Sequence, residues 1–284
     1  MYNELFVSNG GKYFGGVVSL RNDTVDTVSI DIFKSDGLNK IDTIKMPGSI
    51  GGDRFAISSD GELIASAVYN DFGKGLISIY SITEKKFINE INNFNRVDWI
   101  SFYEKMKLII GKNEKTYFYD LTSSDFTEEK VFRVINYDNV DVIWKKRNLV
   151  LIGGKRIKSK TFAFFKPVYA LDGIIVSEIG GNVIKYSLDG DIVWEIDISE
   201  LGHAINLYYI KQRNTIFLDV FNYTRGGMTC VIVDNENGTI INKHTMPIAT
   251  YTVVPNENGL IICDDGSVYA LNDNFDLNFV RKLK

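Results

Sequence analysis

The chain is poor in the residues that build metal centres and disulfide frameworks. Its 284 residues include two cysteines, Cys230 and Cys263, and two histidines, His203 and His244. Two histidines are too few for a three-histidine zinc site, and the sequence has no Cys-x-x-Cys pair. Both cysteines stand inside apolar runs, so we expect buried thiols in strands rather than a disulfide. The sequence therefore predicts no metal site and no disulfide framework.

Long apolar runs and an excess of positive charge are also lacking. No stretch approaches the roughly 18–20 apolar residues that span a bilayer. The first residues do not form the basic and then apolar segments of a secretory signal. The formal net charge of −4 argues against a protein that neutralises many phosphates. We therefore expect a cytoplasmic protein, a monomer on its own, that binds neither membranes nor nucleic acid.

Helical periodicity is almost absent, and short strand-like runs take its place. Runs of β-branched and aromatic residues alternate with Gly, Asn and Asp turns, which is typical of antiparallel strands. The segment 54–91 contains four such runs, and Asp60 and Gly61 give a β-turn signal between the first two. This segment reads as one four-stranded antiparallel unit, whose strands we label a to d from the inside outward.

The same unit recurs along the chain. The segments that begin at Val97 and Val140 both start with Val-Asp and an apolar strand, turn at a basic cluster and reach a Gly-Lys loop. The third strand also recurs, as GLISIYSI from Gly75 and GNVIKYSL from Gly181. One third-strand anchor per unit gives the series Phe33, Tyr80, Tyr119, Phe164, Tyr186, Ile232 and Leu271. Seven units correspond to about 41 residues each, close to the period of WD40-like propellers.

These repeats resemble the blades of the β-propeller superfamily, of both the WD40-like and the quinoprotein-like kind. The resemblance implies an all-β fold, a single propeller domain over 1–284 with seven four-stranded antiparallel blades. Six blades and an insertion are the alternative, because Phe164 and Tyr186 lie only 22 residues apart. Either the fourth unit lacks its outer strand, or 167–171 is that strand and a neighbour is shortened. Because the first and last units each contain four strands, we expect no exchange of a terminal strand.

One stretch, VIKYSLDGDIVWEIDI at 183–198, is similar to the turn region of quinoprotein repeats. A bound quinone would need basic and aromatic ligands that converge on the axis. Only Trp194 stands at the relevant place, whereas Trp99 and Trp144 belong to inner strands of other units. We therefore interpret Trp194 as a packing residue between blades and expect no cofactor.

Motifs for catalysis and for phosphate or calcium binding are missing. The sequence has no Gly-x-Ser-x-Gly elbow and no phosphate-binding glycine loop. The acidic turn at 234–238 lacks the glutamate that closes a calcium loop. Basic turns at 105–107, 145–147 and 211–213 are expected on one face beside acidic turns, where we interpret them as solvated charge. No catalytic residue is predicted.

A partner would bind where loops gather. The loops from strand d to the next strand a, and from b to c, emerge on one face, the usual recognition surface of propellers. We assign to it the segments 69–74, 92–98, 111–115, 153–159, 200–204 and 221–227. Their aromatic and arginine side chains are the types that dominate interface hot spots. The candidate partner-binding residues are Tyr69, Phe72, Phe94, Arg96, Arg156, Tyr223 and Arg225. The alternative for Phe72 and Phe94 is packing onto their own blades.

The leading hypothesis is a non-catalytic propeller that binds a protein. The chain reads as one propeller with no further domain, and it is rich in Asn, Lys and Ile, as in AT-rich bacterial genes. These features favour a bacterial immunity protein that neutralises a cognate toxin by occluding it, and a basic nuclease would suit an acidic partner. The alternative is an enzyme or small-ligand binder, of hydrolase or quinoprotein-like type, that uses the central channel. Converging carboxylates at the channel mouth would favour that alternative.

Overall fold

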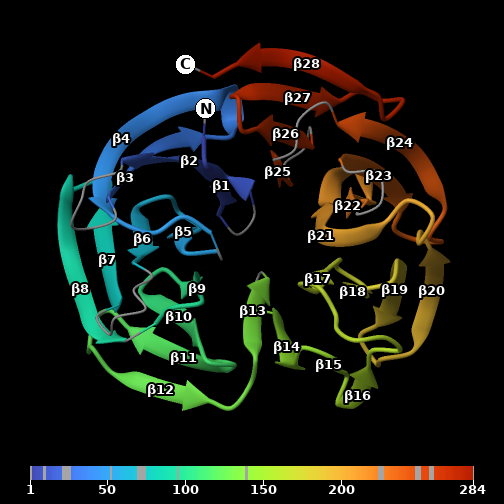
Figure 1. Ribbon diagram of the computed structural model, residues 1–284, viewed down its shortest axis with the longest axis horizontal. Helices are drawn as coiled ribbons and strands as arrows, with labels where there is room; N and C mark the ends of the chain where they lie inside the picture. Colours follow the sequence, from blue (N-terminus) through green and yellow to red (C-terminus); the bar gives the residue numbers. More distant parts are fainter. Residues whose placement is uncertain are drawn as a thin grey trace. The chain divides into compact units, whose positions relative to one another are not determined.

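A computed structural model describes residues 2–8, 11–20, 27–51, 53–68, 75–94, 96–137, 140–222, 227–246, 251–255 and 259–283. These residues form seven antiparallel sheets of four strands each, and the strands of every sheet follow one another in the sequence. The protein is thus an all-β, seven-bladed β-propeller, as the repeats predict (Figure 1). We number the blades 1 to 7 in chain order.

The chain divides into two compact units, of which the first contains blades 1 to 3. Blade 1 consists of β1 (Glu4–Val7), β2 (Tyr13–Leu20), β3 (Thr27–Lys34) and β4 (Asn39–Pro47). Blade 2 consists of β5 (Phe55–Ile57), β6 (Leu63–Ala67), β7 (Gly75–Ser81) and β8 (Lys86–Phe94). Blade 3 consists of β9 (Trp99–Glu104), β10 (Lys107–Lys112), β11 (Lys115–Asp120) and β12 (Phe126–Glu129).

The second unit contains blades 4 to 7. Blade 4 consists of β13 (Arg133–Tyr137), β14 (Val140–Lys146), β15 (Leu149–Ile152) and β16 (Lys155–Lys158). Blade 5 consists of β17 (Val168–Tyr169), β18 (Gly173–Ser177), β19 (Asn182–Ser187) and β20 (Ile192–Asp197). Blade 6 consists of β21 (His203–Ile210), β22 (Thr215–Phe221), β23 (Met228–Asp234) and β24 (Ile240–Met246). Blade 7 consists of β25 (Tyr251–Val254), β26 (Leu260–Cys263), β27 (Ser267–Leu271) and β28 (Leu277–Lys282).

Burial follows the position of a strand within its blade. Strand β6 is buried at every residue, and its sequence is accordingly an apolar or small run on both faces. The outer strands β12 and β28 are exposed at nearly every residue. Within each unit the core lies between neighbouring sheets: one cluster joins blades 2 and 3, and another joins blades 5 and 6. Each blade therefore needs a neighbouring blade to cover its apolar face.

Two glycine turns show why the hairpins use Asp-Gly. Gly61 has a φ of +74°, and a Cβ there would lie 2.5 Å from the ring of Tyr13. Gly190 has a φ of +80° in the turn between β19 and β20. Glycine enters this left-handed region without steric cost, so both turns depend on it.

Blade 4 corrects the strand assignment made from the sequence. Phe164 was expected in its third strand, but Phe164 forms only an isolated bridge with Glu178. Strand β13 supplies the first strand, so β14, which begins at Val140, is the second and β15 is the third. The segment 167–171 is not the outer strand of this blade either, because Val168 and Tyr169 form the first strand of blade 5. Phe164 and Tyr186 are close in the sequence because Phe164 follows the last strand of blade 4 and is not its third-strand residue; no strand is missing.

The ends of the repeat series agree with the sequence. Blade 1 and blade 7 each consist of four consecutive strands, so neither borrows a strand from the other end of the chain. Cys230 and Cys263 are buried and free, in β23 and β26. Among the described residues no helix is long and apolar enough to cross a membrane. The described residues include two three-residue helical turns, η2 (Asp36–Leu38) and η3 (Lys211–Arg213).

Candidate functional site

Four of the seven candidate partner-binding residues lie outside the described residues. These four are Tyr69, Phe72, Tyr223 and Arg225. The placement of the other three, Phe94, Arg96 and Arg156, follows from their strands and contacts.

Phe94 is a core residue and not an exposed loop aromatic. It ends β8, only 4% of it is exposed, and its ring packs edge-on against Tyr117 and Phe126 of blade 3, with centroids 5.4 and 5.3 Å away. The ring thus covers the next blade rather than its own. This corrects the expectation of an exposed aromatic at 94, because the outer strand of blade 2 continues to the very end of the apolar run.

Arg96 forms an ion pair within the loop between blades 2 and 3. Its Nε lies 2.8 Å from Oδ1 of Asp98, and Oδ2 of Asp98 accepts a hydrogen bond of 2.9 Å from the backbone N–H of Asn113. Asn113 stands in the turn between strands b and c of blade 3. The d-to-a loop and the b-to-c turn therefore meet at this end of the blade, as predicted. Arg96 itself is exposed.

Arg156 lies inside β16, the outer strand of blade 4, and not in a b-to-c loop. The segment 153–159 accordingly comprises the c-to-d turn and the last strand. The same shift moves the basic turn 145–147 to the b-to-c turn, whereas the basic turns at 105–107 and 211–213 connect strands a and b. The three basic turns thus do not share one end of their blades, which corrects the expected common basic face.

The two a-to-b basic turns are engaged in contacts between blades. Lys105 pairs with Asp60 and Glu62 of blade 2, at 3.0 and 2.5 Å. The guanidinium of Arg213 donates to the carbonyls of Leu271 and Asn272 of blade 7, at 2.8 and 2.7 Å. These cations therefore hold neighbouring blades together.

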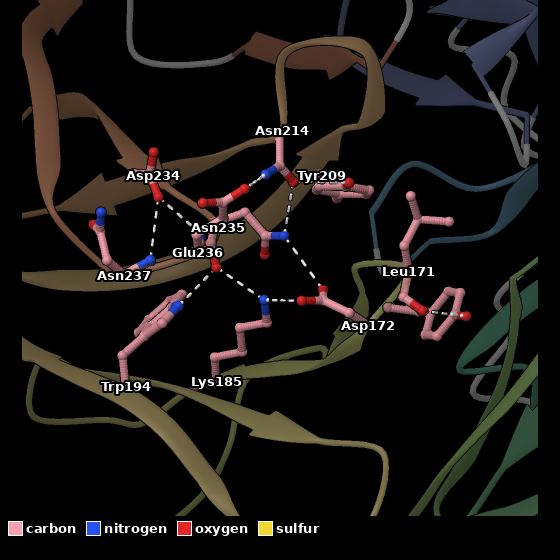
Figure 2. Close-up of polar contacts among 11 residues, drawn as sticks. Leu171, Asp172, Lys185, Trp194, Tyr209, Asn214, Asp234, Asn235, Glu236 and Asn237 are labelled. Carbon is pink, nitrogen blue, oxygen red and sulfur yellow. Dashed lines mark hydrogen bonds and ion pairs between the residues drawn. The ribbon is translucent and has the colours of Figure 1, made fainter.

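A partly buried polar network joins blades 5 and 6 (Figure 2). Lys185 of β19 is fully buried, and its Nζ donates to the carboxylate of Asp172 and to the backbone carbonyl of Asn235, both at 2.8 Å. Nε1 of Trp194 donates to the same carbonyl at 2.9 Å. Asn235 stands in the c-to-d turn of blade 6, so two side chains of blade 5 hold one carbonyl of its neighbour.

The side chain of Asn235 extends this network. Its Nδ2 donates to Oδ1 of Asn214 at 2.9 Å and to Oδ1 of Asp172 at 3.3 Å (Figure 2). The hydroxyl of Tyr209 also donates to Oδ1 of Asn214, at 3.2 Å. Trp194 is 7% exposed and belongs to the core cluster between blades 5 and 6. Trp194 is therefore a packing residue between blades, as expected from the sequence.

The groups of this network stabilise the contact between blades 5 and 6. Burial by itself would raise the pKa of the Asp172 carboxyl, but hydrogen bonds from Lys185 and Asn235 outweigh burial and lower that pKa. The Lys185 amine is enclosed and donates to two acceptors, so a substrate carbonyl has no approach to it. Among the described residues no group of three or more His, Cys, Asp or Glu side chains could hold a metal. Desolvation raises the pKa of the Cys230 thiol, which keeps that thiol protonated and unreactive.

The connection from blade 4 to blade 5 presents an exposed aromatic that sequence reasoning did not single out. Phe162 is 84% exposed, the highest value for a large apolar side chain among the described residues. The backbone beside it is fixed on two sides: the N–H of Phe164 donates to Arg147 at 2.8 Å, and that of Ile179 donates to Ala163 at 3.1 Å. Ile179 is also exposed, at 36%. The sequence TFAFF at 161–165 was expected to form a strand, with Phe164 as its anchor.

Comparisons with known proteins identify the fold and no family. No protein-family model matches the chain, and no curated protein matches it by sequence. Solved structures do match. Hsv2 from Kluyvelomyces marxianus has a TM-score of 0.71 at 7% identity, and the match covers 99% of this chain and 98% of the Hsv2 chain. BamB from Moraxella catarrhalis has a TM-score of 0.60 at 10% identity, and the match covers 99% of this chain and 90% of the BamB chain.

A third similar structure is a complex. Sqt1 from Chaetomium thermophilum, bound to the N-terminus of the ribosomal protein L10, has a TM-score of 0.63 at 11% identity and covers 95% of this chain and 85% of its own. At these identities the likeness establishes the propeller fold, and fold does not fix function.

Proposed function

We propose that this protein is a non-catalytic propeller that binds another protein. The observation that carries this proposal is the exposure of Phe162 on a connection whose backbone is hydrogen-bonded to blades on both sides. A large aromatic side chain held out in water on a rigid support is the kind of residue that anchors an interface. The similar structure of Sqt1 with a segment of L10 supports the proposal, because that propeller binds a protein.

The narrower hypothesis concerns the kind of partner. Composition favours a cytoplasmic bacterial protein, a monomer on its own, that neutralises a cognate toxin by occluding it. A basic nuclease was the expected toxin, because the chain is acidic overall. Blade 4 changes that expectation, because Lys145, Lys146 and Arg156 of its strands are exposed and suit a partner with an acidic surface. A toxin thus stays a hypothesis, and the capture experiment below would identify it.

The test is affinity capture from the native cell with tagged wild-type protein and a Phe162→Ser variant, followed by mass spectrometry. Because Phe162 is exposed, its replacement should change the free energy of unfolding by no more than about 0.5 kcal/mol. We expect one protein to be captured in stoichiometric amount by the wild type and about tenfold less by the variant.

Phe279→Ser is the matched control, since Phe279 is an exposed phenylalanine on the outer strand of blade 7, at 60% exposure. This control should capture as much partner as the wild type. Capture of no protein above the level of an unrelated propeller would contradict the protein-binding function. Equal loss in both variants would contradict the role of Phe162.

A further inference from the structure

Positive charge is concentrated in one blade. Residues 131–167, which comprise blade 4 and its connection to blade 5, contain nine Lys or Arg and two Asp, a net charge of +7. Because the whole chain carries −4, the remaining residues carry −11. Blade 5, at 168–197, has six Asp or Glu and one Lys, a net charge of −5. A basic blade therefore stands next to an acidic one in the second unit.

Pairing with blade 5 uses only part of this charge. Lys155 pairs with Asp191, and Lys160 pairs with Glu195, each at 2.7 Å. Four further cations are exposed and form no ion pair with any residue that the structure describes. They are Lys145, Lys146, Arg156 and Lys158. The neighbouring blade therefore does not account for the basic character of this one.

The strand register brings three of these cations together. Leu149 of β15 pairs with Lys146 on one side and with Lys158 on the other. Residues directly opposite each other share a face of the sheet, so Lys146 and Lys158 lie two strand spacings apart, about 10 Å. Arg156 precedes Lys158 by two residues and shares its face, at roughly 7 Å. Like charges at these positions repel, and an anionic partner would relieve that repulsion.

The exposed aromatic lies at the same end of the blade. The chain leaves β16 at Lys158 and reaches Phe162 four residues later. On the way the N–H of Ser159 donates to the carbonyl of Asn148, at 3.0 Å, which holds the connection against the b-to-c turn that follows Lys146. Lys146, Lys158 and Phe162 thus border a single end of blade 4, and Arg156 lies two residues further along β16; strands β14 to β16 are yellow-green in Figure 1.

We propose that blade 4 binds a short acidic segment of the partner protein, with its carboxylates on Lys145, Lys146, Arg156 and Lys158 and an apolar side chain on Phe162. This proposal rests on the protein-binding function proposed above and adds the chemistry of the bound segment. Carboxylates satisfy the exposed cations, and the apolar side chain covers the exposed ring. We call these five residues the blade-4 surface.

The distribution of charge favours an acidic protein segment over nucleic acid. A DNA duplex carries one negative charge per about 1.7 Å and continues past any single blade. Such a polymer would run onto blade 5, whose net charge is −5. Single strands usually need several aromatic platforms for successive bases, whereas this surface offers Phe162 only. A short segment can end where the basic charge ends.

Fluorescence anisotropy with two labelled synthetic peptides tests the proposal. One peptide has four Asp or Glu around a single Leu, and its counterpart has Asn and Gln at the same positions. The test variant is Lys145→Glu, Lys146→Glu, Arg156→Glu and Lys158→Glu combined. The control variant changes the net charge equally at exposed lysines of other blades: Lys12→Glu, Lys34→Glu, Lys45→Glu and Lys243→Glu.

We expect the acidic peptide to bind wild type and control alike, and the blade-4 variant at least about tenfold more weakly. Added salt should weaken this binding. Phe162→Ser should weaken it without changing its salt dependence. Equal binding of the Asn/Gln peptide, equal loss in the control, or no binding of the acidic peptide would each overturn the proposal.

The two proposals fail in different ways. If the wild type captures a cellular protein and the blade-4 variant captures it equally well, the acidic-segment proposal is overturned while the protein-binding function stands. If the peptide behaves as expected and no cellular protein is captured, the protein-binding function is contradicted. Tighter binding of a single-stranded oligonucleotide or of phosphatidylserine vesicles than of the acidic peptide, lost in the blade-4 variant, would also overturn the acidic-segment proposal.

Discussion

Nζ of Lys185 lies 2.8 Å from a carboxylate oxygen of Asp172, although the Lys185 side chain is fully buried and that of Asp172 is 61% exposed. The carboxylate therefore stays hydrated while it neutralises a buried cation. This arrangement lowers the desolvation cost that makes fully buried ion pairs poor stabilisers. The second acceptor, the carbonyl of Asn235, ties the same amine to the neighbouring blade.

Loss of the Asp172 carboxylate should destabilise the protein more than loss of the Lys185 amine. Asp172→Asn leaves the buried amine without a counter-ion, and because Asp172 is largely exposed we expect a loss of about 2–3 kcal/mol in the free energy of unfolding, below the usual range. Lys185→Met removes the charge and leaves one hydrogen bond to the Asn235 carbonyl, so we expect about 1–2 kcal/mol. Urea denaturation of both variants and the double variant measures these losses. A double-variant loss equal to the sum of the single losses would show that the pair is not coupled.

The same pair predicts a pH dependence. Hydrogen bonds from Lys185 and Asn235 hold the pKa of Asp172 below its ordinary value in the folded protein. The unfolded chain therefore binds this proton more readily, near pH 4, and the stability that Asp172 contributes is present above that pH and lost below it. We expect the stability difference between wild type and Asp172→Asn to shrink as the pH falls from 7 to 3. A difference that stays constant over this interval would contradict the role of the carboxylate.

The propeller could be predicted from the sequence because a similar third-strand pattern recurs from blade to blade. Tyr80 and Tyr119 stand in the third strands β7 and β11 as expected, since the run of β-branched and aromatic residues around each of them is local. Phe164 was misassigned because TFAFF resembles a strand, while the true third strand of blade 4 has four residues and no aromatic. Spacing along the chain could not reveal this, since pairing of β13 with β14 decides the register.

The burial and contacts of individual side chains could be predicted less well from the sequence, because they depend on the neighbouring blade. Phe94 was expected in an exposed loop and Phe162 in a strand, yet Phe94 is 4% exposed and Phe162 is 84% exposed. Phe94 is covered by rings 23 and 32 residues further along the chain, at Tyr117 and Phe126. Lys185 likewise reads as a surface residue in an apolar run, and its acceptor on Asn235 lies 50 residues away.

Alanine substitution at two glycines should distinguish the stability cost of a strained backbone from the cost of a steric clash. Gly61 and Gly154 have similar φ values, +74° and +77°, but only Gly61 has a neighbour where a Cβ would be, the Tyr13 ring at 2.5 Å. Gly154→Ala should therefore cost about 1 kcal/mol from the left-handed backbone. Gly61→Ala should cost about 1–3 kcal/mol more, because Tyr13 must move. Thermal unfolding of both variants measures the difference, and equal losses would show that Tyr13 moves without cost.

Phe94, which was expected in an exposed loop, and Phe162, which was expected in a strand, should respond oppositely to truncation. Phe94→Ala removes a ring from the cluster between blades 2 and 3, so we expect a loss of about 3–5 kcal/mol in the free energy of unfolding. Phe162→Ala removes an exposed ring and should change stability by no more than about 0.5 kcal/mol. Binding should show the reverse order: Phe162→Ala weakens partner capture, whereas Phe94→Ala, measured at a temperature where it stays folded, does not. Loss of capture in the folded Phe94→Ala variant would place the partner on blades 2 and 3 instead.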